Sequence, residues 1–287
     1  MRNLFTNHYF RIPENEFTLW FFGDVHYGVQ SFDEDRFKEF VKIATNECEN
    51  PYFLAMGDYL DFASFSGNKK LNSGDLHESE EEWINSRIKR DCDDFMKMIE
   101  PMRGRLVGMI GGNHQFQMAN GRNTDEYICE KMGTKYLGWL SVIDLGFGST
   151  KPNSNQQNHC RIFACHRARG GRLIGSSING VVDMSNIVAN ADIYAAGDDH
   201  KRHATPKPIL QIRQSSMSEC GFHLKQMRQY FIRSGSFQKS YVKDTSGFAQ
   251  SKLMYPVDLG AVRVDVKIKR KQVYGSDELV LMLEARI

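Results

Sequence analysis

The chain lacks the features that mark several special classes of protein. Among its 287 residues, no apolar run approaches the roughly 20 residues that cross a bilayer, and the first residues lack the apolar core of a secretory signal. Its six cysteines are scattered, with no C-x-x-C pair, which argues against a disulfide framework or a zinc knuckle. The net charge of +2 gives no global argument for nucleic acid. These absences favour a globular cytoplasmic protein without a membrane partner.

What the sequence does contain is an alternation of strand-like and helix-like segments. Short apolar runs, the first three followed by glycine, predict buried strands, whereas apolar residues at helical spacing predict amphipathic helices. The predicted strands are Phe17–Phe22, Tyr52–Met56, Arg105–Ile110, Trp139–Leu145, Arg161–Cys165 and Ile193–Ala196. The predicted helices are Asp33–Cys48, Ser79–Ile99 (with Trp83 among its inward residues), Thr124–Met132 and Asn179–Ala189.

Beyond Pro206 the pattern becomes rich in strands. Strand–helix alternation followed by several strands indicates an α/β fold whose sheets are completed by the C-terminal part. We therefore predict a single domain over residues 1–287, with the part from about residue 206 finishing the sheets.

Polar side chains that could bind metal follow five of the predicted strands. They are Asp24 and His26, Asp58, Asn113 and His114, His166, and Asp198 and His200. In an α/β sheet, functional groups gather at the carboxyl ends of the strands. The spacing of Asp24 and His26 would put both side chains on one face of an extended chain, and the same holds for Asp198 and His200.

Carboxylate, imidazole and amide ligands together suit divalent ions such as Mn²⁺, Fe²⁺ or Zn²⁺. Seven such ligands exceed what one ion needs, whereas two ions ~3.5–4 Å apart with a bridging carboxylate would use them all. Taken singly, Asp24 and Asp58 could equally cap a loop or a helix. His166 is marked only by its place after a strand.

The ordered set of motifs resembles the calcineurin-like metallophosphoesterase superfamily. The resemblance is carried by GDVH (Gly23–His26), GDYLD (Gly57–Asp61), GNH (Gly112–His114), His166 and GDDH (Gly197–His200), and it spans the chain up to about residue 200. It implies an α/β fold of two packed β-sheets flanked by helices. It also implies a hydrolase that cleaves phosphate esters at a dinuclear metal centre.

The resemblance further implies a role for each residue. Asp24, His26 and His200 would bind the first metal, and Asn113, His166 and Asp198 the second, with Asp58 bridging the two. His114 would contact the substrate phosphate and protonate the leaving oxygen, held by Asp61.

Three positions depart from the family pattern. Asp198 stands where the G-H-x-H motif has its first histidine, Gln115 follows His114 in place of an acid, and Phe62 follows Asp61 where protein phosphatases have an arginine. The oxygen ligand at Asp198 favours a harder ion, so Mn²⁺ is expected ahead of Mg²⁺, Fe²⁺ or Zn²⁺. The missing arginine argues against a phosphoprotein phosphatase.

Basic residues follow two of the motifs and are candidates for binding substrate. They are Arg167, Arg169, Arg172, Lys201 and Arg202. From there to Lys243 further cations alternate with aromatic residues, a composition that can track a nucleic-acid backbone or simply form a solvated face. The segment Phe65–Glu78 is either a flap over the site or a surface excursion.

The sequence thus predicts a metal-dependent phosphodiesterase acting on DNA or RNA, and the resemblance is compatible with the nuclease or phosphodiesterase branch of the superfamily. A small-molecule phosphodiesterase or phosphomonoesterase, and a non-catalytic scaffold on the same fold, are the alternatives. The oligomeric state is not indicated by the sequence.

Overall fold

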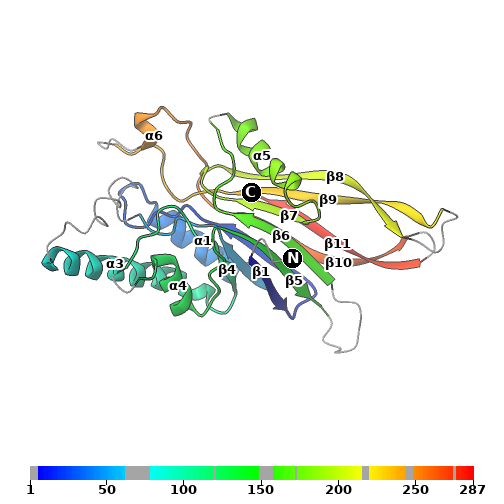
Figure 1. Ribbon diagram of the computed structural model, residues 1–287, viewed down its shortest axis with the longest axis horizontal. Helices are drawn as coiled ribbons and strands as arrows, with labels where there is room; N and C mark the ends of the chain where they lie inside the picture. The colour runs from blue at the N-terminus through cyan, green and yellow to red at the C-terminus, as the bar shows by residue number, and fades with distance from the viewer. Residues whose placement is uncertain are drawn as a thin grey trace.

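The computed structural model describes residues 6–61, 78–118, 121–148, 158–171, 173–214, 220–243, 248–273 and 276–287. Arg172 and residues 65–77 of the proposed flap lie outside these ranges. Two β-sheets pack face to face, and helices cover the outer face of each (Figure 1). The predicted fold class is therefore confirmed.

The larger sheet has six strands. In spatial order they are β1 (Thr6–Ile12), β5 (Leu140–Phe147), β6 (Asn158–Cys165), β7 (Ile193–Ala196), β9 (Phe222–Ser234) and β8 (Arg202–Gln214). Strand β1 was not predicted from the sequence; it pairs in parallel with β5 along its whole length. Strands β6, β7 and β9 also run parallel, so the carboxyl ends of β6 and β7 lie at one edge of the sheet.

The smaller sheet has five strands. In spatial order they are β11 (Ser276–Arg286), β10 (Val262–Val273), β2 (Phe17–Phe22), β3 (Pro51–Ala55) and β4 (Leu106–Met109). Strands β2, β3 and β4 are parallel. The four C-terminal strands divide between the two sheets: β8 and β9 extend the larger, and β10 and β11 the smaller.

The helices begin and end at residues suited to those positions. They are α1 (Glu34–Asn46), α3 (Glu78–Ile99), α4 (Thr124–Met132), α5 (Ile174–Asp183) and α6 (Phe248–Ser251), with 3₁₀ turns at Glu100–Met102 and Met184–Asn186. Asp33 caps α1, and Asn123 forms a capping box with Glu126 at the start of α4. Helix α5 begins five residues before the predicted start. No helix in the described ranges combines the length and apolar character that crossing a bilayer requires.

Strand β2 illustrates why its sequence is apolar throughout. Phe21 points between the two sheets with Leu19, whereas Phe22 points the other way, against Phe37 and Phe40 of α1. A strand buried on both faces cannot alternate apolar and polar residues. A third cluster, around Phe163, lies between the larger sheet and α5.

Helix α3 corrects one sequence-based expectation. Ile84, Ile88 and Phe95 are buried as predicted, but Trp83 is 66% exposed. Successive helix residues are rotated by about 100°, so Trp83 lies to one side of the stripe that begins at Ile84. Its size and apolar character suggested burial, yet its position on the helix does not allow it.

Replacing Phe95 by Ala should destabilise the protein by about 3–5 kcal/mol, because it empties a site fully enclosed by protein. The Phe95 ring stacks on Phe37 at 6.1 Å and on Tyr59 at 6.0 Å. Trp83→Ala, in the same helix, is the matched control and should change stability by no more than about 0.5 kcal/mol. Urea unfolding measures both; equal losses would contradict the burial pattern of α3.

Candidate metal centre

Loops at the carboxyl ends of five strands meet at one place, and backbone hydrogen bonds hold them together. After β2, Asp24 N donates to Gly57 O at 2.9 Å, in the loop after β3. After β7, Gly197 N donates to His166 O at 2.9 Å, in the segment after β6. Asp198 N donates to the Asp24 carboxylate at 3.1 Å. The two G-D-x-H segments therefore meet at a single site.

The backbone at this site is in an unusual conformation. Among the described non-glycine residues, seven have positive φ, and five of them are Asp24 (47°), His26 (51°), Asp58 (51°), Asp198 (66°) and His200 (56°). A left-handed conformation costs a non-glycine residue about 1–2 kcal/mol, and such strain concentrates at functional sites. The two D-x-H segments are therefore matching turns and not extended chain, although their side chains do converge as predicted.

Glycine is required where the loops approach most closely. Gly57 has φ of 99°, and a Cβ there would overlap the His166 ring. A Cβ on Gly112 would overlap the backbone and carboxylate of Asp58. Any other residue at either position would separate the loops after β3, β4 and β6.

The predicted ligands of the first metal lie together. His200 Nε2 is 3.6 Å from Asp24 Oδ1 and 3.3 Å from His26 Nε2. Asp24 and His26 are buried, whereas His200 is partly exposed. These three residues form one of the groups whose side-chain atoms could hold an ion.

The predicted ligands of the second metal surround one ring nitrogen. His166 Nε2 lies 3.0 Å from Asn113 Oδ1, 3.1 Å from Asp58 Oδ2 and 4.0 Å from Asp198 Oδ1. Asp198 is the most distant of the three, and its other oxygen lies 3.3 Å from Arg167 Nε. Asp198 nevertheless faces the second group.

Asp58 lies between the two groups of side chains. Its Oδ2 is 3.9 Å from His26 Nε2 on one side and 3.1 Å from His166 Nε2 on the other. The same oxygen is 3.9 Å from His114 Nε2, so His114 also lies within ligand reach. Geometry alone therefore does not separate a ligand role for His114 from a substrate role.

Hydrogen-bond acceptors behind the histidines orient their rings toward the cluster. His166 Nδ1 donates to Met56 O at 2.6 Å, and His26 Nδ1 lies 3.2 Å from Asp61 Oδ2. A proton held on Nδ1 leaves the Nε2 lone pair facing the cluster, as in metal-binding histidines. Asp61 also lies 3.2 Å from His114 Nδ1, through its other oxygen. One carboxylate thus contacts two histidines, whereas the sequence predicted only the contact with His114.

The site combines buried charges of both signs, and their pKa values shift accordingly. Burial, with Asp58 close by, raises the pKa of Asp24 to about 7 despite the opposing effect of His166. Burial opposes ionisation of Asp58 too, but His166, His26 and His114 hold its pKa well below the ordinary range. Burial and the neighbouring His26 lower the pKa of His200 to about 3. Burial would also lower the pKa of His166, but Asp58 and Asp24 raise it to about 10.

These residues fit divalent cations. Asp24 is a fully buried carboxylate that resists ionisation when no positive ion is present. The Nε2 atoms of His26 and His200 lie 3.3 Å apart, too close for both to carry a proton. A cation between such groups would satisfy the carboxylates and both lone pairs.

His114 and Asp61 lie at the open side of the cluster. His114 is 22% exposed, whereas His166 is fully buried. Burial would lower the pKa of His114, but Asp61 and Asp58 raise it above its ordinary value. Burial would raise the pKa of Asp61, but His114 and His26 lower it to about 2. The pair thus places a histidine whose protonated form is favoured at the open side of the cluster.

The predicted substrate-binding residues fall into two sets. Arg167 is 73% exposed beside Asp198, and Arg169 is exposed on the same segment. An open cleft of about 420 Å³ lies next to the predicted ligands of the second metal. Arg167 and Arg169 line it together with Gly170, Gly171, Asp198 and Asp199. Lys201 and Arg202 are engaged within the protein. Lys201 Nζ binds Gly171 O and Asp199 at 2.9 Å, and Arg202 is half-buried, with a guanidinium nitrogen against Gly260.

The basic and aromatic stretch after residue 201 does not gather at the metal centre. Tyr230, Phe231 and Phe237 are core residues. Arg233 is buried, and its guanidinium donates to Gly197 O at 2.8 Å and to Arg169 O at 2.7 Å. Arg233 therefore fixes the turn that carries Asp198 and the segment that carries Arg169. From the sequence, Arg233 was grouped with the other cations after residue 201, because no neighbouring residue marks it as buried.

Asp125 is a further residue that the sequence did not indicate. It is buried in the first turn of α4, and its Oδ2 accepts from Gly112 N at 3.0 Å. Its neighbour Thr124 accepts from Phe116 N at 3.1 Å. The start of α4 thus holds both ends of the turn that carries Asn113 and His114. An acid in the first turn of a helix is common, so the sequence offered only a weak signal.

Comparison with known proteins gives similarities of fold alone. No family model matches the chain, and no curated protein matches it. Among solved structures, it aligns with a Staphylococcus aureus protein described as a 5′-nucleotidase in complex with alpha-ketoglutarate, at 10% identity and a TM-score of 0.43. That alignment covers 93% of this chain and 54% of the other, so this chain spans about half of that protein.

Two further solved structures align over most of both chains. One is a Plasmodium protein described as the anchor in the inner membrane complex (11% identity, TM-score 0.39, 90% of this chain and 84% of that one). The other is the calcineurin-like phosphoesterase YfkN from Bacillus subtilis (9% identity, TM-score 0.32, 95% and 91%). The chemistry of the present site follows from its own side chains.

Replacing Asp125 by Asn should stabilise the metal-free protein in a pH-dependent way. Burial raises the pKa of Asp125 from 3.8 to about 7, although the bond from Gly112 opposes this. The protonated carboxyl stabilises the folded state below about pH 4, and that contribution is lost as the pH rises to about 7. The free energy of unfolding that Asp125→Asn gains over wild type should therefore increase from about pH 4 to about pH 7 and then level off.

Urea unfolding in the presence of chelator, from about pH 4 to about pH 8.5, measures this gain. Asp35→Asn is the matched control, because Asp35 is an exposed acid in the first turn of α1. A gain that does not change with pH would show that Asp125 is not a buried titrating group.

Proposed function

We propose that this protein is a metal-dependent phosphoesterase with a dinuclear centre. The observation that carries the proposal is the buried Asp58 carboxylate between two groups of ligands. Asp24, His26 and His200 would hold the first ion, and Asn113, His166 and Asp198 the second. Carboxylate, imidazole and amide groups lie together in one compact set. This supports metal binding over the alternative that each residue separately caps a loop or a helix.

Two such ions, when bound, supply an activated water and neutralise charge on phosphoryl oxygens. The remaining chemistry falls to the protein. His114 lies at the open side of the cluster and is the group placed to donate a proton to the leaving oxygen. Asp61, 3.2 Å from His114 Nδ1, orients that ring and favours its protonated form.

We propose Mn²⁺ as the preferred ion at the second position. The donors facing it are three oxygens, from Asn113, Asp58 and Asp198, and a single nitrogen from His166. Oxygen-rich sites favour harder ions than Zn²⁺. The contact of Asp198 with Arg167 also suggests that the second ion is held more weakly than the first.

The substrate class we propose is a phosphodiester, with DNA or RNA as the first candidates. Arg167 and Arg169 beside an open cleft support an anionic substrate larger than a single phosphate. A small-molecule phosphodiester is the second candidate, because the cations after residue 201 do not extend this basic surface. Lys201 is paired internally, and Arg233 is buried.

Asp58→Ala and His114→Ala should separate metal binding from proton transfer. Asp58→Ala removes the proposed bridge and should lose at least one ion. His114→Ala should keep both ions and lose ~10²–10⁴-fold in turnover, the usual contribution of a general acid. Metal content of protein purified without chelator, and hydrolysis of bis-p-nitrophenyl phosphate with Mn²⁺, measure the two effects.

His159→Ala provides the matched control for both variants. His159 Nδ1 lies 2.9 Å from Asp144 Oδ1 at the other end of β6, so replacing His159 should leave metal content and turnover unchanged. Equal metal loss in Asp58→Ala and His114→Ala would make His114 a ligand. Wild-type protein without metal and without turnover would support the scaffold alternative.

A substrate panel with Mn²⁺ distinguishes the two substrate classes. It should contain single- and double-stranded DNA, RNA, a cyclic dinucleotide, mononucleotides and a phosphopeptide. If nucleic acid is the substrate, its affinity should fall with salt at a log–log slope of about −0.7 to −0.9 per phosphate contacted. Arg167→Glu with Arg169→Glu should reduce that slope, whereas Lys89→Glu, on the exposed face of α3, should not. Turnover of the cyclic dinucleotide alone would favour the small-molecule class.

A further inference from the structure

The larger sheet has a short strand at its centre. Strand β7 has four residues, whereas its neighbours β6 and β9 have eight and thirteen. Pairing with β7 begins at Ile162 of β6 and at Tyr230 of β9. On the amino-terminal side of Ile193, no strand among the described residues lies between the first residues of β6 and those of β9. We call the space between Asn158–Arg161 and Lys225–Arg228 the strand slot.

Asp192 closes the strand slot at its inner end. Its N–H donates to Arg161 O at 2.8 Å, and its carboxylate accepts from Arg161 N at 2.8 Å. Its carbonyl accepts from Tyr230 N at 2.9 Å. One residue thus bonds both neighbouring strands at the point where β7 begins.

Beyond Asp192 the backbone of both strands faces the slot. Peptide groups alternate in direction along a strand, so His159 is directed like Arg161, and Arg228 and Gln226 like Tyr230. On their other sides β6 is paired with β5, and β9 with β8. Within the described residues, no backbone hydrogen bond crosses the slot beyond Asp192.

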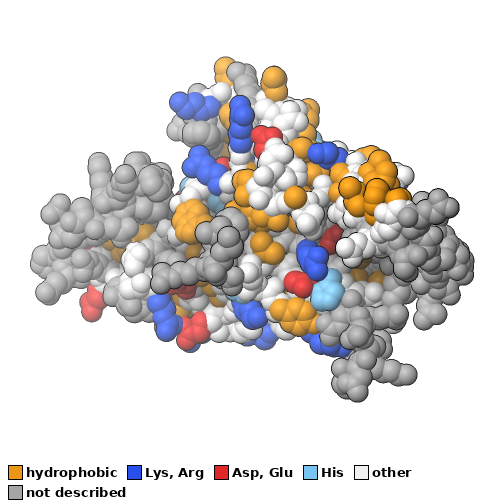
Figure 2. Space-filling view, turned by 45° about the vertical axis from the view of Figure 1, so that its right-hand side comes forward, with side chains coloured by type: hydrophobic (Ala, Val, Ile, Leu, Met, Phe, Trp, Pro, Cys, Tyr) orange, Lys and Arg blue, Asp and Glu red, His pale blue; other side chains and the backbone are white. Residues whose placement is uncertain are grey.

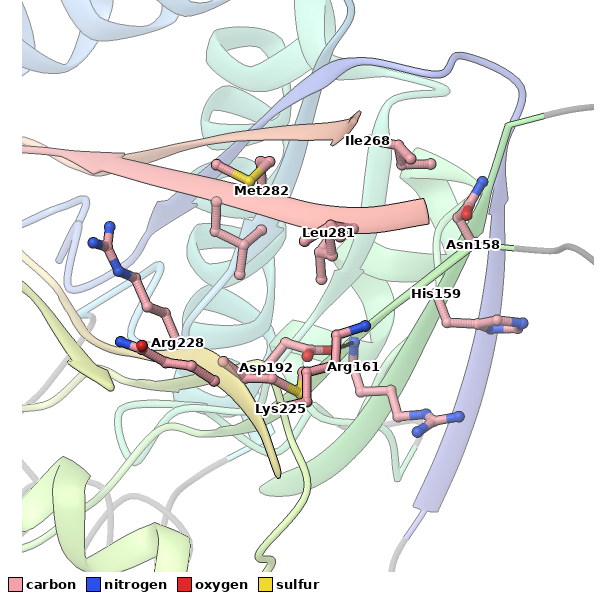
Figure 3. Close-up of a pocket in the computed structure, with 13 residues that line it drawn as sticks. Asn158, His159, Arg161, Asp192, Lys225, Arg228, Ile268, Leu281 and Met282 are labelled. Carbon is pink, nitrogen blue, oxygen red and sulfur yellow. Dashed lines mark hydrogen bonds between the residues drawn. The ribbon is translucent and has the colours of Figure 1, made fainter. Parts of the chain in front are cut away.

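At Asp192 the slot has the width of one strand, because this residue bonds both β6 and β9. Strands that flank a third strand lie about 9–10 Å apart, and four residues extend about 13 Å. A cleft of about 680 Å³ occupies this space, with Asn158, His159 and Arg161 at one side and Lys225 and Arg228 at the other (Figure 3).

The floor of the slot is apolar, and a basic residue lies at its outer face. Ile268 of β10 and Leu281 and Leu283 of β11 form the floor, where they pack on the core between the sheets (Figure 3). Arg161 is exposed on the outer face of β6, because its neighbours Cys160 and Ile162 point into the core between the sheets, whereas Arg228 lies on the same face of β9 as Tyr230. Of the two neighbouring acids, Asp192 binds Arg161 N and Asp144 is paired with His159.

Exposed apolar residues continue this surface beyond the slot. Leu210, Ile212, Phe222 and Leu224 are 66%, 70%, 45% and 53% exposed. Ile212 pairs with Leu224 across the β8–β9 hairpin, and the strand alternation puts Leu224 on the same face as Tyr230. Hydrophobic side chains gather on the corresponding right-hand part of the molecule in Figure 2.

We propose that the strand slot binds an extended peptide segment in which apolar and acidic residues alternate. The segment would lie in line with β7 and bond to β6 and β9, the mode known as strand addition. Its apolar side chains would face Leu281 and Leu283, and its acidic ones would lie on the outer face of the sheet, beside Arg161. The slot lies about 17–26 Å from His166 along β6, so this site is separate from the metal centre.

The test uses a fluorescein-labelled peptide of seven residues that alternates Glu and Val, with the full-length protein. Fluorescence anisotropy should show saturable binding. Methylating alternate backbone amides keeps every side chain but removes the donors, and should weaken binding at least about tenfold. A peptide with Lys in place of Glu should not bind.

Matched protein variants test the site itself. Arg161→Glu should weaken binding about fivefold, because its contacts with the acidic side chains of the peptide become repulsive. Lys89→Glu, an equally exposed charge on α3, should leave it unchanged. In hydrogen exchange, the peptide should protect the amides of Gln226 and Arg228. Absence of binding, or binding that tolerates the methylated amides or Arg161→Glu, would overturn the proposal.

Discussion

The metal centre depends on the bonds that converge on Asp58. Its carbonyl accepts from Val25 N and His26 N at 2.9 and 3.0 Å, which holds the loop after β2. Its carboxylate accepts from His114 N at 3.0 Å and lies 3.1 Å from His166 Nε2, which holds the segments after β4 and β6. A single residue thus fixes the ends of four strands, and it does so only in a left-handed backbone conformation.

Such a site costs stability, because buried carboxylates and left-handed residues are both unfavourable. The surrounding protein supplies the compensation. Tyr59 OH donates to Ile110 O at 2.6 Å and so joins the ends of β3 and β4. Arg233 supplies a buried positive charge and fixes the loop after β7 through Gly197 O. The polar cluster is consequently framed by hydrogen bonds that do not involve the proposed ligands.

The fold and the site differ in how far the sequence could predict them. Strands β2, β3 and β7 were predicted within a residue or two, because they are apolar runs buried on both faces. Strand β1 was missed, since "TNHYFRI" is mixed in character and is fixed only by pairing with β5. The ligand residues stood out as polar groups after apolar runs. The left-handed turns, Asp125 and Arg233 did not, because each depends on contacts between segments far apart in the chain.

The length of β7, four residues, is fixed by contacts at both of its ends. Asp192 is bonded to both neighbouring strands at one end, and the turn with Asp198 and His200 begins at the other. Because side chains alternate in direction, one inserted residue would turn every following side chain to the opposite face. The length of this strand is therefore fixed more tightly than its composition. Replacing Ala195 would change packing, whereas lengthening β7 by one residue would remove Asp198 and His200 from the cluster.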